Sequence, residues 1–368
     1  MRICYLANSA IPSANASSIQ IVKMCEAFVN LNHEVLLITT GVSNKNIFNF
    51  YDVRSKFNYI RLKKFTKFPL GIKYYLFSIF SILESFKFKP EIYITRNFFT
   101  CFLLTVLKKK TILELHHDVS DESRVVRFLV KKLNFLNSSY IIKLIAITKY
   151  AKKNYVSNYL VKENKIIILP SGSSISKNFT FSKNKKKFNI GYFGSLYKSR
   201  GSKIIINLAK IDRKNNYFMY GKIDQLDKLN SIRNIKNLEI KDYISYKKIP
   251  KILSKMDILL MPYTSRITAA GDYGDITNFT SPLKLFDYLS VGRVILCSNY
   301  PVLYEVLKDN KNAIFIENYK NIIAWKKEIE KLSFNKEKVF LISKNNFKLS
   351  KKFNHIKRAN KIVELIKK

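Results

Sequence analysis

The chain has 368 residues and a formal net charge of +40, from 66 basic and 26 acidic side chains. Hydrophobic residues make up 47% of it and aromatic residues 14%, so the composition excludes a disordered chain and is sufficient for two packed cores. The four cysteines form no C-x-x-C pair and the four histidines lack metal-ligand spacing, which excludes a disulfide framework and a zinc site and indicates a reduced, cytoplasmic protein.

Short apolar runs alternate with helical patterns along the chain. In the first half, strands are predicted at residues 3–7, 34–39, 59–62, 92–95, 111–115, 144–147 and 166–169. In the second half, they are predicted at residues 189–193, 217–220, 238–241, 258–261, 294–297 and 313–316. Helical patterns between them include residues 19–31, 74–86, 150–159, 202–210 and 250–256. This alternation predicts an α/β protein with parallel sheets and helices on both faces.

A polar, lysine-rich break at residues 171–187 separates two such series of strands and helices. We therefore predict two doubly wound, Rossmann-like domains, residues 1–178 and 179–344, that face a central cleft. In sheets of this kind, ligands bind beyond the carboxyl ends of the strands. The tail, residues 345–368, is predicted as one basic amphipathic helix.

No targeting or membrane-spanning segment is predicted. The N-terminus enters a strand pattern at once, without the long apolar stretch of a signal peptide. The most apolar window, residues 70–86, contains Lys73 and Glu84 and is short for a bilayer crossing. We therefore expect it to be a core helix or a helix on a membrane surface.

The high positive charge has two interpretations. A compositional bias toward Lys, Asn and Ile would have no functional meaning, but it does not explain the excess of basic over acidic residues. A surface this positive is attracted to anionic membranes and nucleic acids. Because no nucleic-acid-binding signature accompanies the charge, we expect no nucleic-acid partner and favour peripheral contact with the inner face of the cytoplasmic membrane. The lysine run at 183–187 is interpreted as a solvated loop.

Polar residues follow two strands of the first half. Ser17, Ser18 and Gln20 precede the first long helix, and Arg96 follows the strand at 92–95. These residues are candidates for contacts with a phosphate or a sugar, because the loops after parallel strands approach the ligand. For Ser17, Ser18 and Gln20 the commoner interpretation is that they simply form the polar start of a helix.

Two adjacent histidines, His116 and His117, follow the strand at 111–115. A histidine at such a position can hydrogen-bond a sugar hydroxyl or stabilise developing charge. The alternative is a structural hydrogen bond, which is the usual role of a single histidine.

Glycines and a cation follow strands of the second half. Gly194 and Ser195 follow the strand at 189–193, Arg200 lies shortly after them, and Gly221 follows the strand at 217–220. Glycine lets a ligand approach the backbone, and arginine can hold phosphate oxygens with its fork of donors. A tight turn with an exposed arginine is the alternative.

The segment 280–298 predicts a helix followed by a buried strand. Ser281 is expected to be the N-cap, Pro282 the first helical residue and Gly292 the end of the helix. The helix start and Lys284 would bind a phosphate, and Asp287 would accept hydroxyl groups of a sugar or ribose. Together these features indicate a nucleotide sugar. A capped helix with a solvated lysine and aspartate explains the segment equally well.

The main motifs, in chain order, are CYLANSAIPSANASSIQIVKMCEAF, HEVLLIT, YITRN, LELHHD, IAITKYAKKNY, ILPSGSS, IGYFGSLYKSRG, MYGK, MDILLMPY, SPLKLFDYLSVGRVI and PVLYEVL. Their order resembles that of a retaining glycosyltransferase of the GT-B fold, in the large family 4 group. The resemblance spans almost the whole chain, and SPLKLFDYLSVG is its most specific part. It implies a C-terminal domain that binds a nucleotide sugar, an N-terminal domain that faces the acceptor, and a last helix that returns to the N-terminal domain.

The resemblance also assigns carboxylates and cations. Asp287 stands where the family has the second glutamate of its E-x7-E motif, which holds the ribose. Phe279 stands where the first is expected, so the role of that glutamate is either absent or displaced to Asp272 or Asp275. The basic pair for the diphosphate maps near Ser195 and Arg200. The donor site implied in this way consists of Gly194, Ser195, Arg200, Gly221, Ser281, Pro282, Leu283, Lys284 and Asp287.

The implied reaction moves a sugar from a nucleotide-diphosphate sugar to a glycan or polyprenyl-linked acceptor, with retention at the anomeric carbon. The setting implied is the biosynthesis of bacterial surface polysaccharide, capsule or lipopolysaccharide. Arg200 and Lys284 would stabilise the leaving diphosphate, so no metal or other cofactor is expected. His116 or His117 matches the family's histidine near the transferred sugar, while Arg96 and the serines before the first helix would face the acceptor.

Two other function classes fit the sequence. A GT-B nucleotide-sugar epimerase would act on the donor without an acceptor, but it needs carboxylates and histidines placed for elimination, and no such set is clear. A non-catalytic basic protein on a degenerate GT-B scaffold is the second, and the missing carboxylate at Phe279 favours it.

Overall fold

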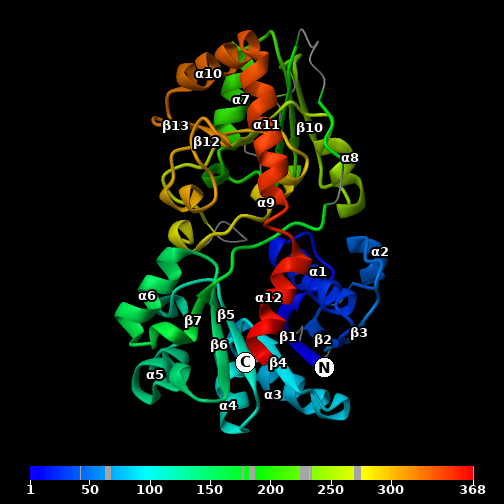
Figure 1. Cartoon of the computed structure of the whole chain (residues 1–368), viewed down its shortest axis with the longest axis vertical. Helices are drawn as coiled ribbons and strands as arrows, with labels where there is room; N and C mark the ends of the chain where they lie inside the picture. The colour runs from blue at the N-terminus through cyan, green and yellow to red at the C-terminus, as the bar shows by residue number, and fades with distance from the viewer. Residues whose placement is uncertain are drawn as a thin grey trace. The chain divides into compact units, whose positions relative to one another are not determined.

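The computed structural model describes residues 1–41, 43–62, 68–175, 178–181, 187–223, 232, 234–268 and 275–367. The chain forms two compact units (Figure 1). Unit 1 comprises Met1–Gly172, Asn278–Ser281 and His355–Lys368, and unit 2 comprises Ser173–Thr277 and Pro282–Asn354. Most of the lysine run at 183–187, and Asp272 with its neighbouring glycines, lie outside the described residues.

Within its described residues, unit 1 holds a seven-stranded parallel sheet in the order β3-β2-β1-β4-β5-β6-β7. Its strands are β1 (Arg2–Ala10), β2 (Glu34–Thr40), β3 (Asn58–Arg61), β4 (Ile92–Thr95), β5 (Thr111–Leu115), β6 (Ile141–Ala146) and β7 (Ile166–Ile168). Its helices are α1 (Ala16–Asn30), α2 (Ile47–Tyr51), α3 (Leu70–Ser85), α4 (Phe98–Val106), α5 (Arg124–Leu133), α6 (Lys149–Tyr159) and α12 (His355–Lys367).

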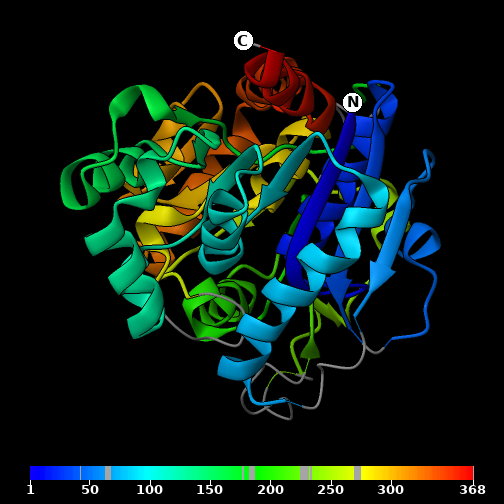
Figure 2. The same ribbon diagram turned by 90° about the horizontal axis from the view of Figure 1, so that it is seen from below.

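The two faces of the unit 1 sheet are covered by different helices. Phe77 of α3 and Leu104 of α4 pack with Cys4 and Leu6 of β1 in one cluster, and Figure 2 shows α3 running across this face. Alternation along β1 turns Tyr5 to the opposite face. There α12 packs against α1 and β6. A strand buried on both faces explains why β1 is a continuous apolar run.

Within its described residues, unit 2 holds a six-stranded parallel sheet in the order β10-β9-β8-β11-β12-β13. Its strands are β8 (Asn189–Phe193), β9 (Asn216–Tyr220), β10 (Leu238–Lys241), β11 (Ile258–Met261), β12 (Val294–Ser298) and β13 (Ala313–Ile316). Its helices are α7 (Ser202–Ile211), α8 (Ile249–Leu253), α9 (Leu283–Ser290), α10 (Ile322–Phe334) and α11 (Lys336–Ser350). Hydrophobic clusters lie on both faces of this sheet.

The prediction of one helix over residues 345–368 is wrong. The chain leaves the helical conformation after α11 and resumes it in α12. Between them, the ring of Phe353 packs against Phe286 with centroids 5.4 Å apart, and the Phe353 carbonyl accepts a hydrogen bond from the Ser173 N–H at 3.1 Å. These tertiary contacts within unit 2 outweigh the helical pattern of the sequence.

The first helix also begins earlier than predicted. α1 starts at Ala16, so Ser17, Ser18 and Gln20 lie in its first two turns rather than in the preceding loop. The cysteines at positions 4, 25, 101 and 297 are all buried and unpaired, in agreement with their expected place in the core. No helix found among the described residues combines the length and apolar character needed to cross a membrane.

Candidate functional site

The candidate site of unit 2 lies where its sheet reverses strand order. β8 is in the middle, with β9 on one side and β11 on the other, the position at which doubly wound sheets bind ligands. β8 ends at Phe193, and the next N–H, that of Gly194, donates to the Tyr220 carbonyl at 2.9 Å. Gly221 follows Tyr220 directly, so both predicted glycines lie together at the carboxyl edge of the sheet.

At positions 194 and 221 neighbouring atoms leave no room for a Cβ, so both positions need glycine. Gly194 has a φ of +137°, which disfavours other residues, and a Cβ there would lie 2.8 Å from Lys284 Nζ. A Cβ on Gly221 would collide with the Gly194 carbonyl oxygen. The backbone at the end of β8 is therefore accessible to a ligand and lies next to a cationic side chain; Gly194 and Ser195 are both exposed.

Lys284 is held over aromatic rings. Its Nζ donates to the Tyr192 hydroxyl at 2.8 Å and lies 4.0 Å from the centroid of the same ring and 5.7 Å from that of Tyr263. The Tyr192 hydroxyl in turn donates to the Ser195 carbonyl at 2.6 Å. Burial, and then the charge of Arg200, hold the pKa of Lys284 well below its ordinary value.

Arg200 lies beside Lys284 at the same edge. It ends the short 3₁₀ turn Lys198–Arg200 before α7, and its guanidinium is 5.6 Å from the Tyr263 ring centroid and donates to the Thr268 carbonyl. Two cations thus share one aromatic ring. Because the proximity of like charges is unfavourable, an anion bound next to them would relieve the repulsion and favour the charged form of Lys284.

The expected cap of α9 is not formed. Ser281 accepts a hydrogen bond from the Ser171 N–H at 2.9 Å and belongs to unit 1. Pro282, with an extended ψ of 120°, precedes the first helical residue, Leu283, and provides no side-chain cap. The prediction of Ser281 as the N-cap is therefore wrong, because the N-cap position is occupied by the next residue, Pro282. The end of the helix is as predicted, since Gly292 has a positive φ of +60° just beyond it.

The predicted carboxylate of this segment is buried. Asp287 is 7% exposed, and its Oδ1 accepts a hydrogen bond from the Ser173 hydroxyl at 2.6 Å. Ser173 is part of the PSGSS motif, to which the sequence assigned no role. Asp275, one of two residues considered as a replacement for the missing glutamate, accepts hydrogen bonds from the Thr277 N–H and hydroxyl at 2.9 and 2.6 Å.

Phe279 packs in the core of unit 1 rather than at a polar site. It is 7% exposed, belongs to the cluster between α4, α5 and β5, and lies edge-on to Tyr150 with centroids 5.3 Å apart. Phe279, which stands at the position of the family's first glutamate, therefore attaches residues 278–281 to unit 1. Within the described ranges, no group of three or more His, Cys, Asp or Glu side chains is placed to hold a metal ion.

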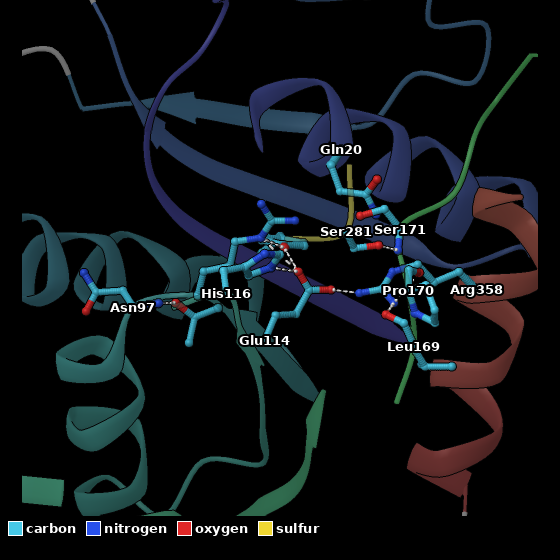
Figure 3. Close-up of polar contacts among 12 residues, drawn as sticks. Gln20, Asn97, Glu114, His116, Leu169, Pro170, Ser171, Ser281 and Arg358 are labelled. Carbon is cyan, nitrogen blue, oxygen red and sulfur yellow. Dashed lines mark hydrogen bonds and ion pairs between the residues drawn. The ribbon is translucent and has the colours of Figure 1, made fainter. Parts of the chain in front are cut away.

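A second candidate site lies at the carboxyl edge of the unit 1 sheet, around Glu114 (Figure 3). Its Oε2 accepts hydrogen bonds from the Tyr5 hydroxyl at 3.0 Å and from Arg96 Nε at 2.9 Å. His116 Nε2 is 3.2 Å from the same oxygen. The other oxygen, Oε1, accepts a hydrogen bond from Arg358 Nη2 at 2.7 Å. We call these five side chains the Glu114 hub.

The hub results from the alternation of β5. Leu113 and Leu115 pack into the cluster beneath α4 and α5, so Glu114 between them points to the face that α12 covers. Arg358 comes from α12 and also donates to the carbonyls of Leu169 and Pro170. The C-terminal helix therefore completes this site, a feature that its amphipathic pattern alone did not indicate.

The protonation states in the hub follow from its charges. Burial opposes ionisation of Glu114, but the charges of Arg96 and Arg358 outweigh it and lower the pKa of the carboxyl well below its ordinary value. Burial and Arg96 lower the pKa of His116 to about 4. The imidazole is therefore neutral near pH 7, so Nε2 carries the proton that it donates to Glu114, and Nδ1 has a free electron pair.

The two histidines left open by the sequence are placed differently. His116 belongs to the hub, whereas His117 Nε2 is 2.8 Å from Glu122 Oε1 and its ring lies edge-on to Phe98. Its backbone carbonyl accepts a hydrogen bond from the Tyr155 hydroxyl at 2.8 Å. Of the two, His116 is the one that lies with the other polar groups at the carboxyl edge.

The polar residues in the first two turns of α1 are only partly available to a ligand. Ser17 is exposed. Ser18 is buried and donates to the Ala10 carbonyl at 3.3 Å. Gln20 is 4% exposed, and its Oε1 is 2.8 Å from His355 Nε2. Gln20 therefore links α1 to α12 next to the hub, while Ser18 fixes the start of the helix.

Solved structures cover the whole of this chain. A glycosyltransferase from Rickettsia africae has a TM-score of 0.73 and 14% identity and covers 100% of this chain and 97% of its own. HepE of Anabaena, solved with UDP and glucose, has a TM-score of 0.71 and 11% identity, with coverage of 100% and 99%. WaaG, a glycosyltransferase involved in lipopolysaccharide biosynthesis, has a TM-score of 0.62 and 12% identity, with coverage of 99% of both chains.

The likeness at these identities shows the fold, and together with the two parallel sheets it confirms the predicted GT-B class. No curated protein matches the sequence significantly. The sequence pattern of the family described as Glycosyl transferases group 1 matches residues 174–358, half of the chain, and this range includes the glycines and cations of unit 2. The chain therefore belongs to the glycosyl transferases group 1 family and is a glycosyltransferase enzyme.

Proposed function

We propose that the protein transfers a sugar from a nucleoside-diphosphate sugar to a glycan or lipid-linked acceptor, with retention at the anomeric carbon, as a family 4 glycosyltransferase of bacterial surface-polysaccharide, capsule or lipopolysaccharide biosynthesis. The observation that carries the proposal is the cation pair of unit 2, Arg200 and Lys284, beside the exposed backbone of Gly194. The sequence SPLKLFDYLSVG, which contains Lys284, supports the family 4 assignment.

The cation pair suits a reaction with a diphosphate leaving group. Negative charge develops on the leaving oxygen as the glycosidic bond breaks, and fixed positive charges already in position lower the energy of that state. Arg200 and Lys284 supply these charges, and the glycine backbone at Gly194 lets the diphosphate approach them. The depressed pKa of Lys284 without ligand means that diphosphate binding and protonation of the lysine favour one another. This mechanism requires no metal ion.

Other residues of both units are candidates for contacts with the nucleotide sugar or the acceptor. Asp287 is the candidate for the ribose hydroxyls, provided that the Ser173 hydroxyl yields its place on Oδ1. Gly221 and the backbone of Pro282 and Leu283 lie in unit 2 with the cation pair. In unit 1, His116 is the candidate for hydroxyl groups of a sugar, because its Nδ1 can accept a hydrogen bond. Ser17 and Arg96 are the candidates for contacts with the acceptor.

Donor binding and product analysis test the proposal. UDP is the first nucleotide to test because HepE was solved with it, and a thermal-shift series with UDP-, GDP- and ADP-sugars should show stabilisation by one donor class. Arg200→Ala should lower turnover by about 10²-fold, whereas Arg213→Ala, an exposed arginine of the same unit, should leave it unchanged. A product with inverted anomeric configuration by NMR would contradict retention.

The same assay separates the alternatives. A nucleotide-sugar epimerase would convert the donor in the absence of any acceptor, and a non-catalytic basic protein would show no stabilisation by any donor. Tight oligonucleotide binding without donor binding would favour the latter.

We further propose contact with an anionic lipid surface, through α3. Ile72, Ile79 and Leu83 of α3, and Phe86 directly after its end, are all exposed at spacings of seven, four and three residues, so they form one apolar stripe. Lys109 Nζ lies 5.8 Å from the centroid of the Phe86 ring, which places cationic charge at one end of the stripe. Exposed apolar side chains beside lysines fit the interface of an anionic membrane.

Vesicle co-sedimentation tests this surface. The protein should bind phosphatidylglycerol-containing vesicles at low salt, and the double substitution Ile79→Asp and Leu83→Asp should weaken binding at least tenfold. Ile323→Asp, a change at a still more exposed residue of α10, is the control and should bind like the wild type. Failure of the wild-type protein to bind at low salt, or equal loss in the control, would contradict the proposal.

A further inference from the structure

The described part of unit 1 has an excess of buried hydrogen-bond donors. Four buried side-chain nitrogens lack a hydrogen-bond partner among the described residues, namely Gln20 Nε2, Arg96 Nη2, Asn97 Nδ2 and Arg358 Nε. All four carry N–H groups, and no buried side-chain oxygen in the described part of this unit is left unpartnered to match them. Because buried polar groups are normally paired, such a one-sided excess leaves donors for the oxygens of ordered water or of a bound ligand.

Two of the four unpartnered donors, those of Arg96 and Arg358, belong to the Glu114 hub, and Asn97 follows Arg96 directly as the N-cap of α4. Arg96 and Arg358 each pair with one oxygen of Glu114 through a different nitrogen from the unpartnered one. Gln20 is joined through its oxygen to His355, which lies one helical turn before Arg358 on α12. Figure 3 shows Glu114 of β5 and Arg358 of α12 pointing toward one another, with Gln20 of α1 in the same view.

The hub also carries uncompensated charge. It contains two guanidinium groups, Arg96 and Arg358, and one carboxylate, Glu114. His116 is neutral near pH 7, because burial and Arg96 lower its pKa to about 4, and the hydroxyl of Tyr5 stays protonated because burial raises its pKa. The net charge is therefore +1. A sugar hydroxyl could satisfy a free donor, but only an anion would also offset this charge.

We propose that this edge of unit 1 binds an oxyanion, a phosphate or a carboxylate, of an acidic acceptor, with Arg96 as the principal contact. Arg96 follows β4, next to β1 at the point where the sheet reverses its order, where ligands bind in such folds. Its side chain is 15% exposed, whereas that of Arg358 is only 4% exposed, so Arg96 is the arginine that a ligand can reach. The proposal deepens the proposed function and rests on it, since the ligand is the acceptor of that reaction.

Ligand-observed NMR titrations test the proposal on the full chain, with saturating UDP so that the cation pair of unit 2 is occupied. The probes are glucose, glucuronate and glucose 6-phosphate, which share a ring and differ in charge. We expect both acidic sugars, or the phosphate alone, to bind at least tenfold more tightly than glucose. Tighter binding of both identifies a general oxyanion site, and tighter binding of the phosphate alone identifies a phosphate site. Equal binding of all three would overturn the proposal.

Two substitutions locate the effect. Arg96→Gln keeps N–H donors but removes the charge, and it should abolish the preference for acidic sugars. Arg124→Gln on α5 removes the charge of an exposed arginine of the same unit outside the hub and should keep the preference. If Arg96→Gln does not fold, Arg96→Lys keeps a charge opposite Glu114 but loses the forked donor, and it should still weaken binding of the acidic sugars at least threefold. An unchanged preference in a folded Arg96 variant would overturn the assignment.

The UDP signal in the same samples separates the two proposals. UDP binding without discrimination among the sugars would contradict only the acidic acceptor. Absence of UDP binding would contradict the proposed donor site itself.

Discussion

The two units hold their cations in opposite ways. In unit 1, Arg96 and Arg358 lie on either side of the buried carboxylate of Glu114, at 2.9 and 2.7 Å. In unit 2, Arg200 and Lys284 lie over the Tyr263 ring, and neither has a carboxylate partner among the described residues. Glu114 compensates one of the two arginine charges in unit 1, whereas neither cation of unit 2 is compensated by a carboxylate among the described residues.

The comparison separates cations that the protein holds with a carboxylate of its own from cations that it leaves without one. Arg96 and Arg358 lower the pKa of Glu114, so that this carboxylate and its partners stabilise one another. Arg200 instead adds to burial in lowering the pKa of Lys284, so that the cations of unit 2 destabilise one another. We therefore expect removal of charge to affect stability most in unit 1 and ligand binding most in unit 2.

Glu114→Gln should have the largest effect on stability. It leaves two arginines without their carboxylate in a buried site, which costs about 3–5 kcal/mol of the free energy of unfolding. Urea denaturation at pH 7 measures it. Glu364→Gln on α12, whose exposed carboxylate is 3.4 Å from Lys361, should cost less than about 1 kcal/mol.

The loss of stability caused by Glu114→Gln should depend on pH. Because the pKa of Glu114 is lowered in the fold, its contribution to stability is complete above the ordinary pKa near 4.5 and is lost as the pH falls through the folded value. The difference between wild type and Glu114→Gln should therefore shrink below about pH 4.5. A difference that grows on acidification would contradict the ionised hub.

Gly194→Ala should mainly impair the donor site. The substitution places a Cβ at a φ of +137° and 2.8 Å from Lys284 Nζ, so we expect about 1–3 kcal/mol of strain and weaker UDP binding. Thermal melting with and without UDP separates the two effects. Gly71→Ala on α3, where a Cβ would meet nothing within 4 Å, is the matched control and should not reduce either quantity. Wild-type UDP binding by Gly194→Ala would remove the end of β8 from the site.

His116 should contribute a smaller, pH-dependent effect. The fold lowers its pKa from 6.5 to about 4, so it disfavours the protonated form, and the protein should lose stability relative to the unfolded chain as the pH falls from 6.5 toward 4. His116→Gln should lose less stability over this range. Urea denaturation at pH 7 and pH 5 measures the difference, and an identical loss in both proteins would contradict the neutral imidazole.

Most strands were predictable because the inner strands of both sheets, such as β4, β5 and β11, are buried on both faces. The predicted bounds at 92–95, 111–115, 189–193, 238–241, 258–261 and 313–316 agree with those of β4, β5, β8, β10, β11 and β13. In a parallel sheet covered on both sides, each strand is a short apolar run between polar segments, so its ends are visible in the sequence. The start of α9 was not predictable in this way, because Ser281 is bound by a distant backbone N–H.

The chemistry of both sites depends on residues that only tertiary structure brings together. Arg358 is one basic residue among many in the C-terminal helix, and nothing local indicates that it meets Glu114, 244 residues earlier. Tyr192 was predicted only as part of an apolar strand and Tyr263 was given no role, yet both rings lie against Lys284. A burial pattern that places Arg358 on the apolar face of α12 is the one signal that could have identified it.

The central claim is that Lys284 and Arg200 bind the diphosphate of the donor. Calorimetric titration of UDP into wild type and Lys284→Met, with the exposed Lys203→Met of α7 as control, tests it most directly. We predict that the Kd for UDP rises at least tenfold in Lys284→Met, which corresponds to about 1.4 kcal/mol, and is unchanged in Lys203→Met. A folded Lys284→Met variant that binds UDP as tightly as the wild type would contradict the claim.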